Sequence, residues 1–216
     1  MADPGHLALT ALSLPGAAFL LLVLVAPLRR AGRPAAYLSI IFAAAALWHA
    51  ARAFWLTSSG SFSLLLWPWI PLEAGPLTGL GVLADTDSTI MLLLVTGVSF
   101  LVQLYSLGYL SDEPMPSLGR YYTYQSLFAF SMMGLVLAPN FVQLFVCWEL
   151  VGLCSYLLIG YWYQRPEAAR AAVKAFWTTK AGDVGLLIGI VLLYRQAGTF
   201  DFLQLLVLVE IGRAHV

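Results

Sequence analysis

Long runs of apolar residues recur along the chain, separated by short polar segments. The runs lie at 7–28, 36–56, 88–110, 121–138, 140–163 and 171–194. Each is close to the roughly 20 residues that an α-helix needs to cross a bilayer. None alternates apolar and polar positions as the strands of an outer-membrane barrel do. The pattern predicts an all-α, polytopic bundle of transmembrane helices with about six complete spans, and a further apolar piece at 202–209 is too short to cross.

Composition supports a membrane protein. Of the 216 residues, 61% are hydrophobic and only 10% are charged, whereas soluble domains carry roughly 25% charged residues. The formal net charge is zero, so we expect no surface for nucleic acid and take the lipid bilayer as the first partner.

Basic residues indicate the orientation of the spans. Three of them follow the first run: Arg29, Arg30 and Arg33. Such clusters stay on the cytoplasmic side, which predicts an N-terminus outside. Segment 57–87 contains no Lys or Arg and is expected to be an external loop or hairpin. Tyr121 and Tyr122 open the fourth run, where an aromatic membrane interface is expected.

Glu149 lies near the middle of the fifth run, roughly 14 Å below the outer surface at 1.5 Å per residue. A charge at that depth costs at least about 2.5 kcal/mol. Burial disfavours the charged form of a carboxyl and a nearby cation favours it, so a carboxyl between these effects can exchange protons. The alternative is a carboxyl that hydrogen-bonds a neighbouring helix and only fixes packing.

Lys180 and Asp183 lie three positions apart in the sixth run, so their side chains can pair on one helix face. Asp183 lies roughly 18 Å below the outer surface, at a depth close to that of Glu149. Acid, base and acid at mid-membrane would suit a proton relay. The alternative is a self-neutralised pair that holds two helices together. Lys174, on the opposite side of the same helix, either extends toward the headgroups or joins the relay.

Motifs for other chemistry are absent from the sequence. It contains no phosphate-binding loop, dinucleotide fingerprint, metal-ligand cluster or nucleophile elbow. We therefore expect no catalytic, metal or cofactor-binding residues in this chain, and energy that arrives from a partner or an ion gradient.

Three segments resemble a known family. They are DSTIML through LGY at 87–109, CWELVGLCSYLLIG at 147–160, and AVKAFWTTKAGD at 172–183. They closely resemble subunit L (the subunit 5 family) of the proton-pumping NADH:quinone oxidoreductase, respiratory complex I. The likeness covers roughly residues 1–205.

The resemblance implies an antiporter-like, proton-translocating subunit. The family's buried glutamate falls on Glu149, its sixth-helix aspartate on Asp183, the basic residue before it on Lys180, and its sixth-helix lysine on Lys174. In the family the glutamate pairs with a lysine of a later, broken helix, which should lie beyond residue 209.

The resemblance also implies an organisation and a setting. Residues 1–56 would form the first two spans, 57–87 the external hairpin, and 88–209 the start of the antiporter-like core. NAD, FMN, iron–sulfur clusters and quinone would belong to partner subunits. Those partners would be other membrane-arm subunits, especially a neighbouring antiporter-like one, and the location a bacterial inner membrane.

Residues 210–216 resemble the translation of a sequencing adaptor, so we expect a non-native tail on a truncated reading frame that neither pumps nor folds as a complete transporter alone. Two other functions remain open. One is the large subunit of a multi-subunit Na⁺/H⁺ antiporter, and the other is a structural subunit of the membrane arm without ion transport.

Overall fold

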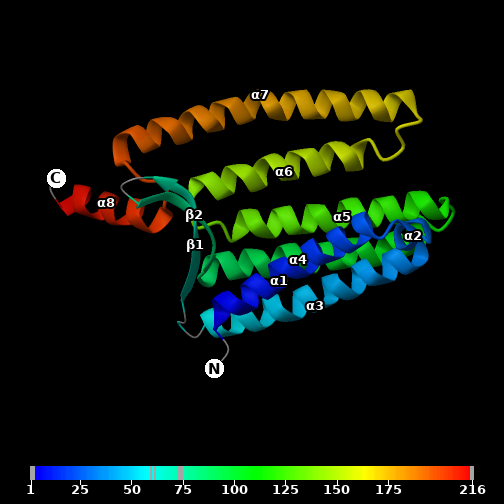
Figure 1. The fold of residues 1–216 in the computed structure, drawn as a ribbon, viewed down its shortest axis with the longest axis horizontal. Helices are drawn as coiled ribbons and strands as arrows, with labels where there is room; N and C mark the ends of the chain where they lie inside the picture. Colours follow the sequence, from blue (N-terminus) through cyan, green and yellow to red (C-terminus); the bar gives the residue numbers. More distant parts are fainter. Residues whose placement is uncertain (1–2, 59, 61, 73–74, 215–216) are drawn as a thin grey trace.

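Long helices stand side by side in the computed structural model, and a two-stranded hairpin crosses one end of the bundle (Figure 1). The structure describes residues 3–58, 60, 62–72 and 75–214. Its elements are α1 Pro4–Leu24, α2 Ala26–Arg30, α3 Arg33–Thr57, β1 Ser63–Leu72, β2 Gly75–Ala84, α4 Thr86–Tyr109, α5 Met115–Val136, α6 Phe141–Ile159, α7 Pro166–Ala197 and α8 Phe202–Ala214. Parts of the predicted segments 1–56, 57–87 and 210–216 lie outside the described residues: 1–2, 59, 61, 73–74 and 215–216.

Five of the described helices are long and apolar enough to cross a membrane: α1, α3, α4, α6 and α7. The prediction of a mostly helical, multi-pass membrane protein is confirmed, whereas the number of spans stays a prediction. The fourth predicted span, 121–138, falls on α5, which is more polar and is not among these five. Since α5 contacts α1, α3, α4 and α6, its polar side chains lie against other helices rather than lipid.

The structure differs from the predicted first span and adds detail to the fourth. The first run is not one helix, because α1 ends at Leu24 and the short α2 follows Val25. Pro27 explains the break, since proline lacks the N–H that would continue the helical hydrogen bonds. Tyr122, expected at an aromatic membrane interface, points into the bundle. It is fully buried, and its hydroxyl donates to the Gln103 carbonyl oxygen at 2.8 Å.

Small and hydroxyl-bearing residues hold α1, α3, α4 and α5 together. Ala8 and Ala11 of α1 pack with Ala46 and Ala50 of α3, all four fully buried. Such residues let helix backbones approach closely in a membrane. The same bundle buries a polar network in which the Ser39 hydroxyl donates to the Gln103 side-chain oxygen and bonds the Ser126 hydroxyl, each at 2.7 Å. The network links α3, α4 and α5.

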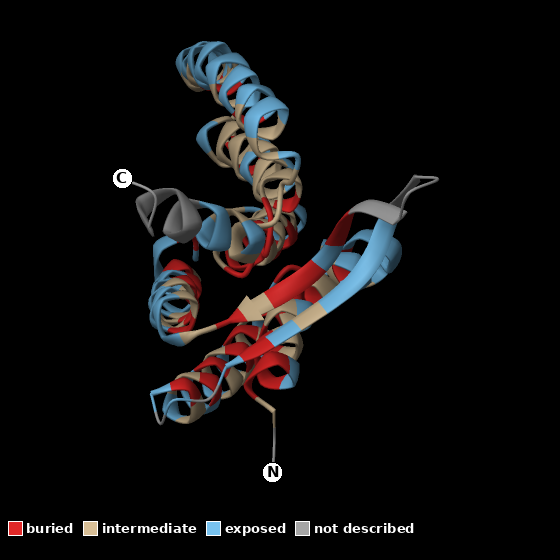
Figure 2. Ribbon diagram, turned by 90° about the vertical axis from the view of Figure 1, so that its left-hand side faces the viewer, coloured by how far each residue is buried: buried red, intermediate tan, exposed pale blue. Residues whose placement is uncertain are grey.

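The hairpin of β1 and β2 is pinned to the start of α6 and lies across the helix ends (Figure 2). The Asn140 side chain donates to the Gly79 carbonyl at 2.6 Å. Gln143 accepts from the Gly81 N–H at 2.7 Å and donates to the Gly81 carbonyl at 2.9 Å. Two side-chain amides thereby replace the strand that β2 lacks on its free side.

Helices α6 and α7 form a pair at one side of the bundle (Figure 1). α6 packs on α5, and α7 packs mainly on α6. The outer side of α7 exposes large apolar side chains: Val173, Trp177, Val184, Leu187, Ile188, Val191 and Leu192. This pair carries the charged residues that the sequence places at mid-membrane.

Candidate functional site

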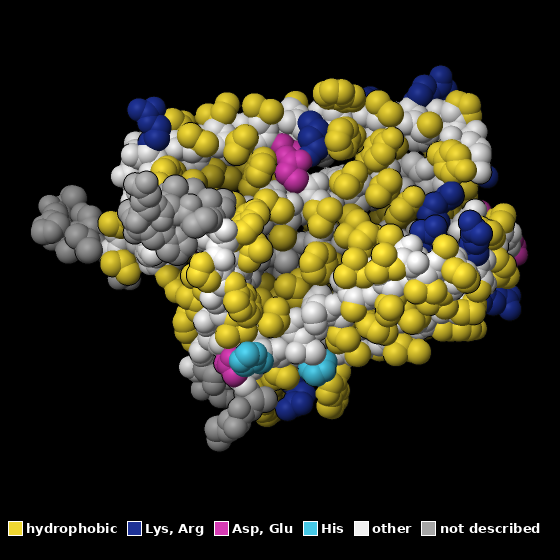
Figure 3. Space-filling model, in the orientation of Figure 1, with side chains coloured by type: hydrophobic (Ala, Val, Ile, Leu, Met, Phe, Trp, Pro, Cys, Tyr) yellow, Lys and Arg dark blue, Asp and Glu magenta, His cyan; other side chains and the backbone are white. Residues whose placement is uncertain are grey.

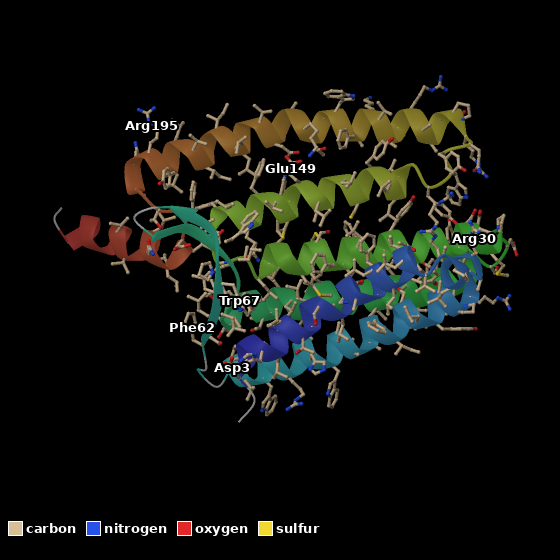
Figure 4. The ribbon with its side chains drawn as sticks, in the orientation of Figure 1. Asp3, Arg30, Phe62, Trp67, Glu149 and Arg195 are labelled. Atoms are coloured by element: carbon tan, nitrogen blue, oxygen red, sulfur yellow. The ribbon has the colours of Figure 1, made fainter. Side chains whose placement is uncertain are left out.

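Glu149 projects from α6 toward α7, about halfway along the pair (Figure 4). α6 starts at an Asn140 N-cap, whose side chain accepts from the Gln143 N–H at 2.9 Å. Its opposite side faces α5, where Cys154 is fully buried beside Ser131. Because α6 uses one side for α5, Glu149 is left facing α7.

The ammonium group of Lys180 lies between two carboxylates. It contacts Glu149 Oε2 across the helix pair and lies 3.1 Å from Asp183 Oδ2 on its own helix. The side chains of Glu149, Lys180 and Asp183 are 33%, 23% and 7% exposed. We call these three residues the α6–α7 ion cluster. The predicted pair of Lys180 and Asp183 is present, and it extends across to the neighbouring helix.

Two further side chains fix the cluster. The indole N–H of Trp148 donates to Asp183 Oδ1 at 2.7 Å, and the Lys180 ammonium lies 5.2 Å from the centre of the Phe176 ring. Both carboxylate oxygens of Asp183 therefore have a donor. Gly152 lies beside the lysine, and a Cβ at that position would be 3.8 Å from Lys180 Nζ, an ordinary van der Waals distance.

The role of Trp148 was missed in the sequence analysis. Trp148 directly precedes Glu149. Adjacent residues on a helix point in different directions, so there was no reason from the sequence to expect both side chains to reach α7. Its long side chain nevertheless reaches across to α7. The sequence offered one signal, namely an indole directly beside a mid-membrane acid. A buried indole N–H usually has a hydrogen-bond partner.

An open groove of about 480 Å³ runs beside the cluster between α6 and α7. It is lined by Leu144, Trp148, Thr178, Thr179, Gly182, Asp183 and Leu186. The two threonine hydroxyls donate to carbonyl oxygens of their own helix, one turn back. The groove therefore reaches Asp183, and Figure 3 shows that acidic and basic side chains are visible at the surface midway along the pair.

Lys174 is not part of this cluster. Its side chain is exposed, and it forms no ion pair with any described carboxylate. It lies six residues before Lys180 on the same helix, toward the end of the bundle that carries α2. The structure thus brings together three of the four predicted site residues.

The cluster carries two acids and one base. With all three groups ionised it has one uncompensated negative charge, which is costly away from water. Addition of one proton makes the cluster neutral. That proton would reside on the carboxylate that is not paired with Lys180. The arrangement can therefore hold one exchangeable proton at either of two sites, and movement of a single ammonium group selects between them.

Two family models match the chain. Residues 69–122 match the N-terminal part of chain 5 of NADH-ubiquinone oxidoreductase (complex I). Residues 138–215 match the transmembrane region described as NADH:quinone oxidoreductase/Mrp antiporter.

Curated relatives are subunits of quinone oxidoreductases. The chain is 45% identical over 175 residues to the chloroplastic NAD(P)H-quinone oxidoreductase subunit 5 of Marchantia polymorpha, covering 80% of this chain and 25% of that protein. It is 53% identical over 123 residues to NAD(P)H-quinone oxidoreductase chain 5 of Synechocystis sp., covering 57% of this chain and 18% of that one. The chain thus spans a quarter or less of the length of these two relatives.

Solved structures share the fold. A chain of the membrane-bound sulfane sulfur reductase, an archaeal respiratory membrane complex, matches with a TM-score of 0.75 at 22% identity, covering 90% of this chain and 38% of that chain. A chain of the Mrp complex from Dietzia sp. matches with a TM-score of 0.72 at 27% identity, covering 91% of this chain and 20% of that one. The helical arrangement is therefore antiporter-like.

Proposed function

Because the chain belongs to the subunit 5 family of complex I, we propose that it forms part of a proton-translocating membrane subunit of an NADH- or NAD(P)H-dependent quinone oxidoreductase. Members of this family carry no redox cofactor. NAD, FMN, iron–sulfur clusters and quinone would be held by partner subunits. The observation that carries the proposal is the α6–α7 ion cluster, in which two mid-membrane carboxylates share one lysine.

The proposed mechanism uses two states of that cluster. In one, Lys180 pairs with Glu149 and the proton resides on Asp183. In the other, Lys180 pairs with Asp183 and the proton resides on Glu149. A change in the neighbouring protein that favours one pairing would release a proton from one site and load the other. Lys174 would connect the cluster with the inner end of α7, about two helical turns away.

The proposed topology has about six spans with the N-terminus outside, in a bacterial inner membrane. Basic side chains support the orientation, since they gather at the end of the bundle that carries Arg30 (Figures 3 and 4). Cytoplasmic ends of membrane proteins carry this excess of Lys and Arg. The exposed apolar side of α7 would contact lipid, later helices of the same subunit, or a neighbouring antiporter-like subunit.

A second candidate function is the large subunit of a multi-subunit Na⁺/H⁺ antiporter. It is favoured by the family description that includes the Mrp antiporter and by the likeness to the Mrp complex from Dietzia sp.. The match of residues 69–122 to chain 5 of complex I favours the oxidoreductase.

Flux measurements separate the two. Inverted vesicles that contain the full-length protein in its complex are given NADH without sodium, or a sodium gradient without NADH, and internal acidification is recorded. We expect acidification with NADH, abolished by an inhibitor of quinone reduction, and none with sodium alone. Sodium-driven proton flux without a redox donor would instead establish the antiporter.

A further inference from the structure

A second polar site lies far from the ion cluster, at the end of the bundle where α1, α2 and α5 meet. It is a pocket of about 400 Å³. Its walls are formed by Phe19, Val23, Arg29, Arg30, Pro116, Arg120, Thr123 and Tyr124. Three guanidinium groups thus border one cavity at the edge of the membrane-spanning region.

The fold brings these arginines together through a glycine. At Gly119 a Cβ would overlap the carbonyl oxygen of Arg29. Because this position has no side chain, α2 can lie directly on α5, which places Arg29 and Arg30 beside Arg120. The cluster of positive charge is thus a consequence of close helix packing and not of a flexible loop.

The positive charge of the pocket is not neutralised by the protein. None of the three arginines forms an ion pair with a carboxylate within the described part of the chain. Arg120 is held in place, since it donates to the Tyr161 carbonyl at 3.3 Å and lies 4.9 Å from the centre of the Tyr163 ring. A guanidinium group has five N–H donors, so donors remain for a ligand.

The rest of the pocket is apolar and continues onto the surface of α1. Phe19 and Val23 line it, and Leu20 and Leu24 beside them are 55% and 78% exposed. On the opposite wall, the Thr123 hydroxyl is committed to the Gly119 carbonyl at 2.8 Å. A ligand that fits has an anionic head for the arginines and a hydrocarbon part for the α1 surface.

We propose that this pocket binds one anionic phospholipid, with its phosphate between Arg29, Arg30 and Arg120 and an acyl chain along α1. Basic pockets between transmembrane helices recognise anionic headgroups in this way. A free phosphate ion would use the arginines but leave the apolar wall unfilled. The lipid would also hold α2 against α5 at the end where the bundle meets the membrane surface.

Native mass spectrometry of the full-length protein in its complex tests the proposal. The complex is given phosphatidylglycerol and phosphatidylcholine with identical acyl chains, and the lipid that stays bound is identified. We expect the wild type to retain phosphatidylglycerol. Replacement of Arg29→Gln together with Arg30→Gln should reduce the preference by about thirtyfold, and the lysine pair Arg29→Lys with Arg30→Lys should keep most of it.

Arg33→Gln is the matched control, because Arg33 belongs to the same basic turn but does not line the pocket. It should leave the lipid preference unchanged. An equal loss in Arg33→Gln, or no loss in the Arg29 and Arg30 double variant with an unchanged thermal midpoint, would overturn the proposal. So would displacement of the lipid by millimolar inorganic phosphate, since the apolar wall would then contribute nothing.

Discussion

The ammonium of Lys180 on α7 contacts the carboxylate of Glu149 on α6. The same ammonium lies 3.1 Å from Asp183, so one cation serves two acids that come from different helices. A simple ion pair would be complete with one acid and would have no reason to take up a proton. In the proposed function, the second carboxylate is what would let the cluster take up one proton.

Removal of Lys180 should destabilise the helix pair. In Lys180→Met both carboxylates lose their cation, and we expect a loss of about 2 kcal/mol in the free energy of unfolding, less than for a fully buried pair because Glu149 is partly exposed. Lys174→Met is the control, since Lys174 is exposed and should change stability by less than about 0.5 kcal/mol. Unfolding in mixed detergent micelles measures both. If Lys180→Leu with Asp183→Leu keeps full proton translocation, these two charges are not needed for it and have at most a structural role that apolar residues can replace.

Trp148 should be coupled energetically to Asp183. Trp148→Phe removes an N–H donated to the carboxylate at 2.7 Å while keeping an aromatic ring. We expect a double-mutant cycle with Asp183→Ala, which removes the acceptor, to give a coupling of about 1–2 kcal/mol. Trp177→Phe serves as the control, because Trp177 is 70% exposed on the outer side of α7. A coupling no larger than that of the control would mean that the hydrogen bond contributes nothing.

Gln143 should anchor the hairpin. Gln143→Leu has nearly the same volume but leaves the buried N–H and carbonyl of Gly81 without these partners. Each unsatisfied buried group costs about 1–3 kcal/mol. We therefore expect faster amide exchange in β2 and a lower thermal midpoint. Gln196→Leu, at an exposed position of α7, should leave exchange in β2 unchanged, and wild-type exchange in Gln143→Leu would contradict the assignment.

Asp201 should make stability depend on pH. It lies between α7 and α8, and burial raises the pKa of its carboxyl above the ordinary value; one of its oxygens has no hydrogen-bond partner within the described part of the chain. A raised pKa in the folded state means that folding favours the protonated form. Its contribution to stability is therefore present at acidic pH and is lost as the pH rises through the folded pKa.

Asp201→Asn tests this sign. The substitution should stabilise the protein more at pH 7 than at pH 4, measured as the difference in thermal midpoint from the wild type. Asp112→Asn, in an exposed turn, is the control for the change in net charge. A larger gain at pH 4 than at pH 7 would show that the carboxylate is stabilised in the folded protein.

The sequence predicted the class of the fold and most of the cluster for identifiable reasons. Apolar runs of span length revealed the helices, and charges within those runs stand out because they are costly there. The i,i+3 spacing of Lys180 and Asp183 reports a pair on one helix directly. Glu149 was found as a carboxyl near the middle of an apolar run, and the family resemblance of the segment around it points to the same residue.

Other features depend on tertiary contacts, which the pattern of apolar and polar residues does not predict. The contact between Lys180 and Glu149 was not predicted, and the family's partner lysine, expected beyond residue 209, stays a prediction. The burial of Tyr122 follows from α5 lying among other helices, which an aromatic side chain near the end of an apolar run cannot reveal. The donor role of Trp148 depends on the distance between α6 and α7.

The proton stoichiometry of Glu149→Gln in the full-length protein tests the central claim most directly. Inverted vesicles are given NADH, and acidification and NADH oxidation are recorded together, with Glu167→Gln as an exposed control on α7. Glutamine keeps the shape of the side chain but cannot exchange a proton. We predict fewer protons translocated per NADH in Glu149→Gln at normal assembly, and an unchanged ratio in the control. A wild-type ratio in Glu149→Gln would contradict a proton site at the α6–α7 ion cluster.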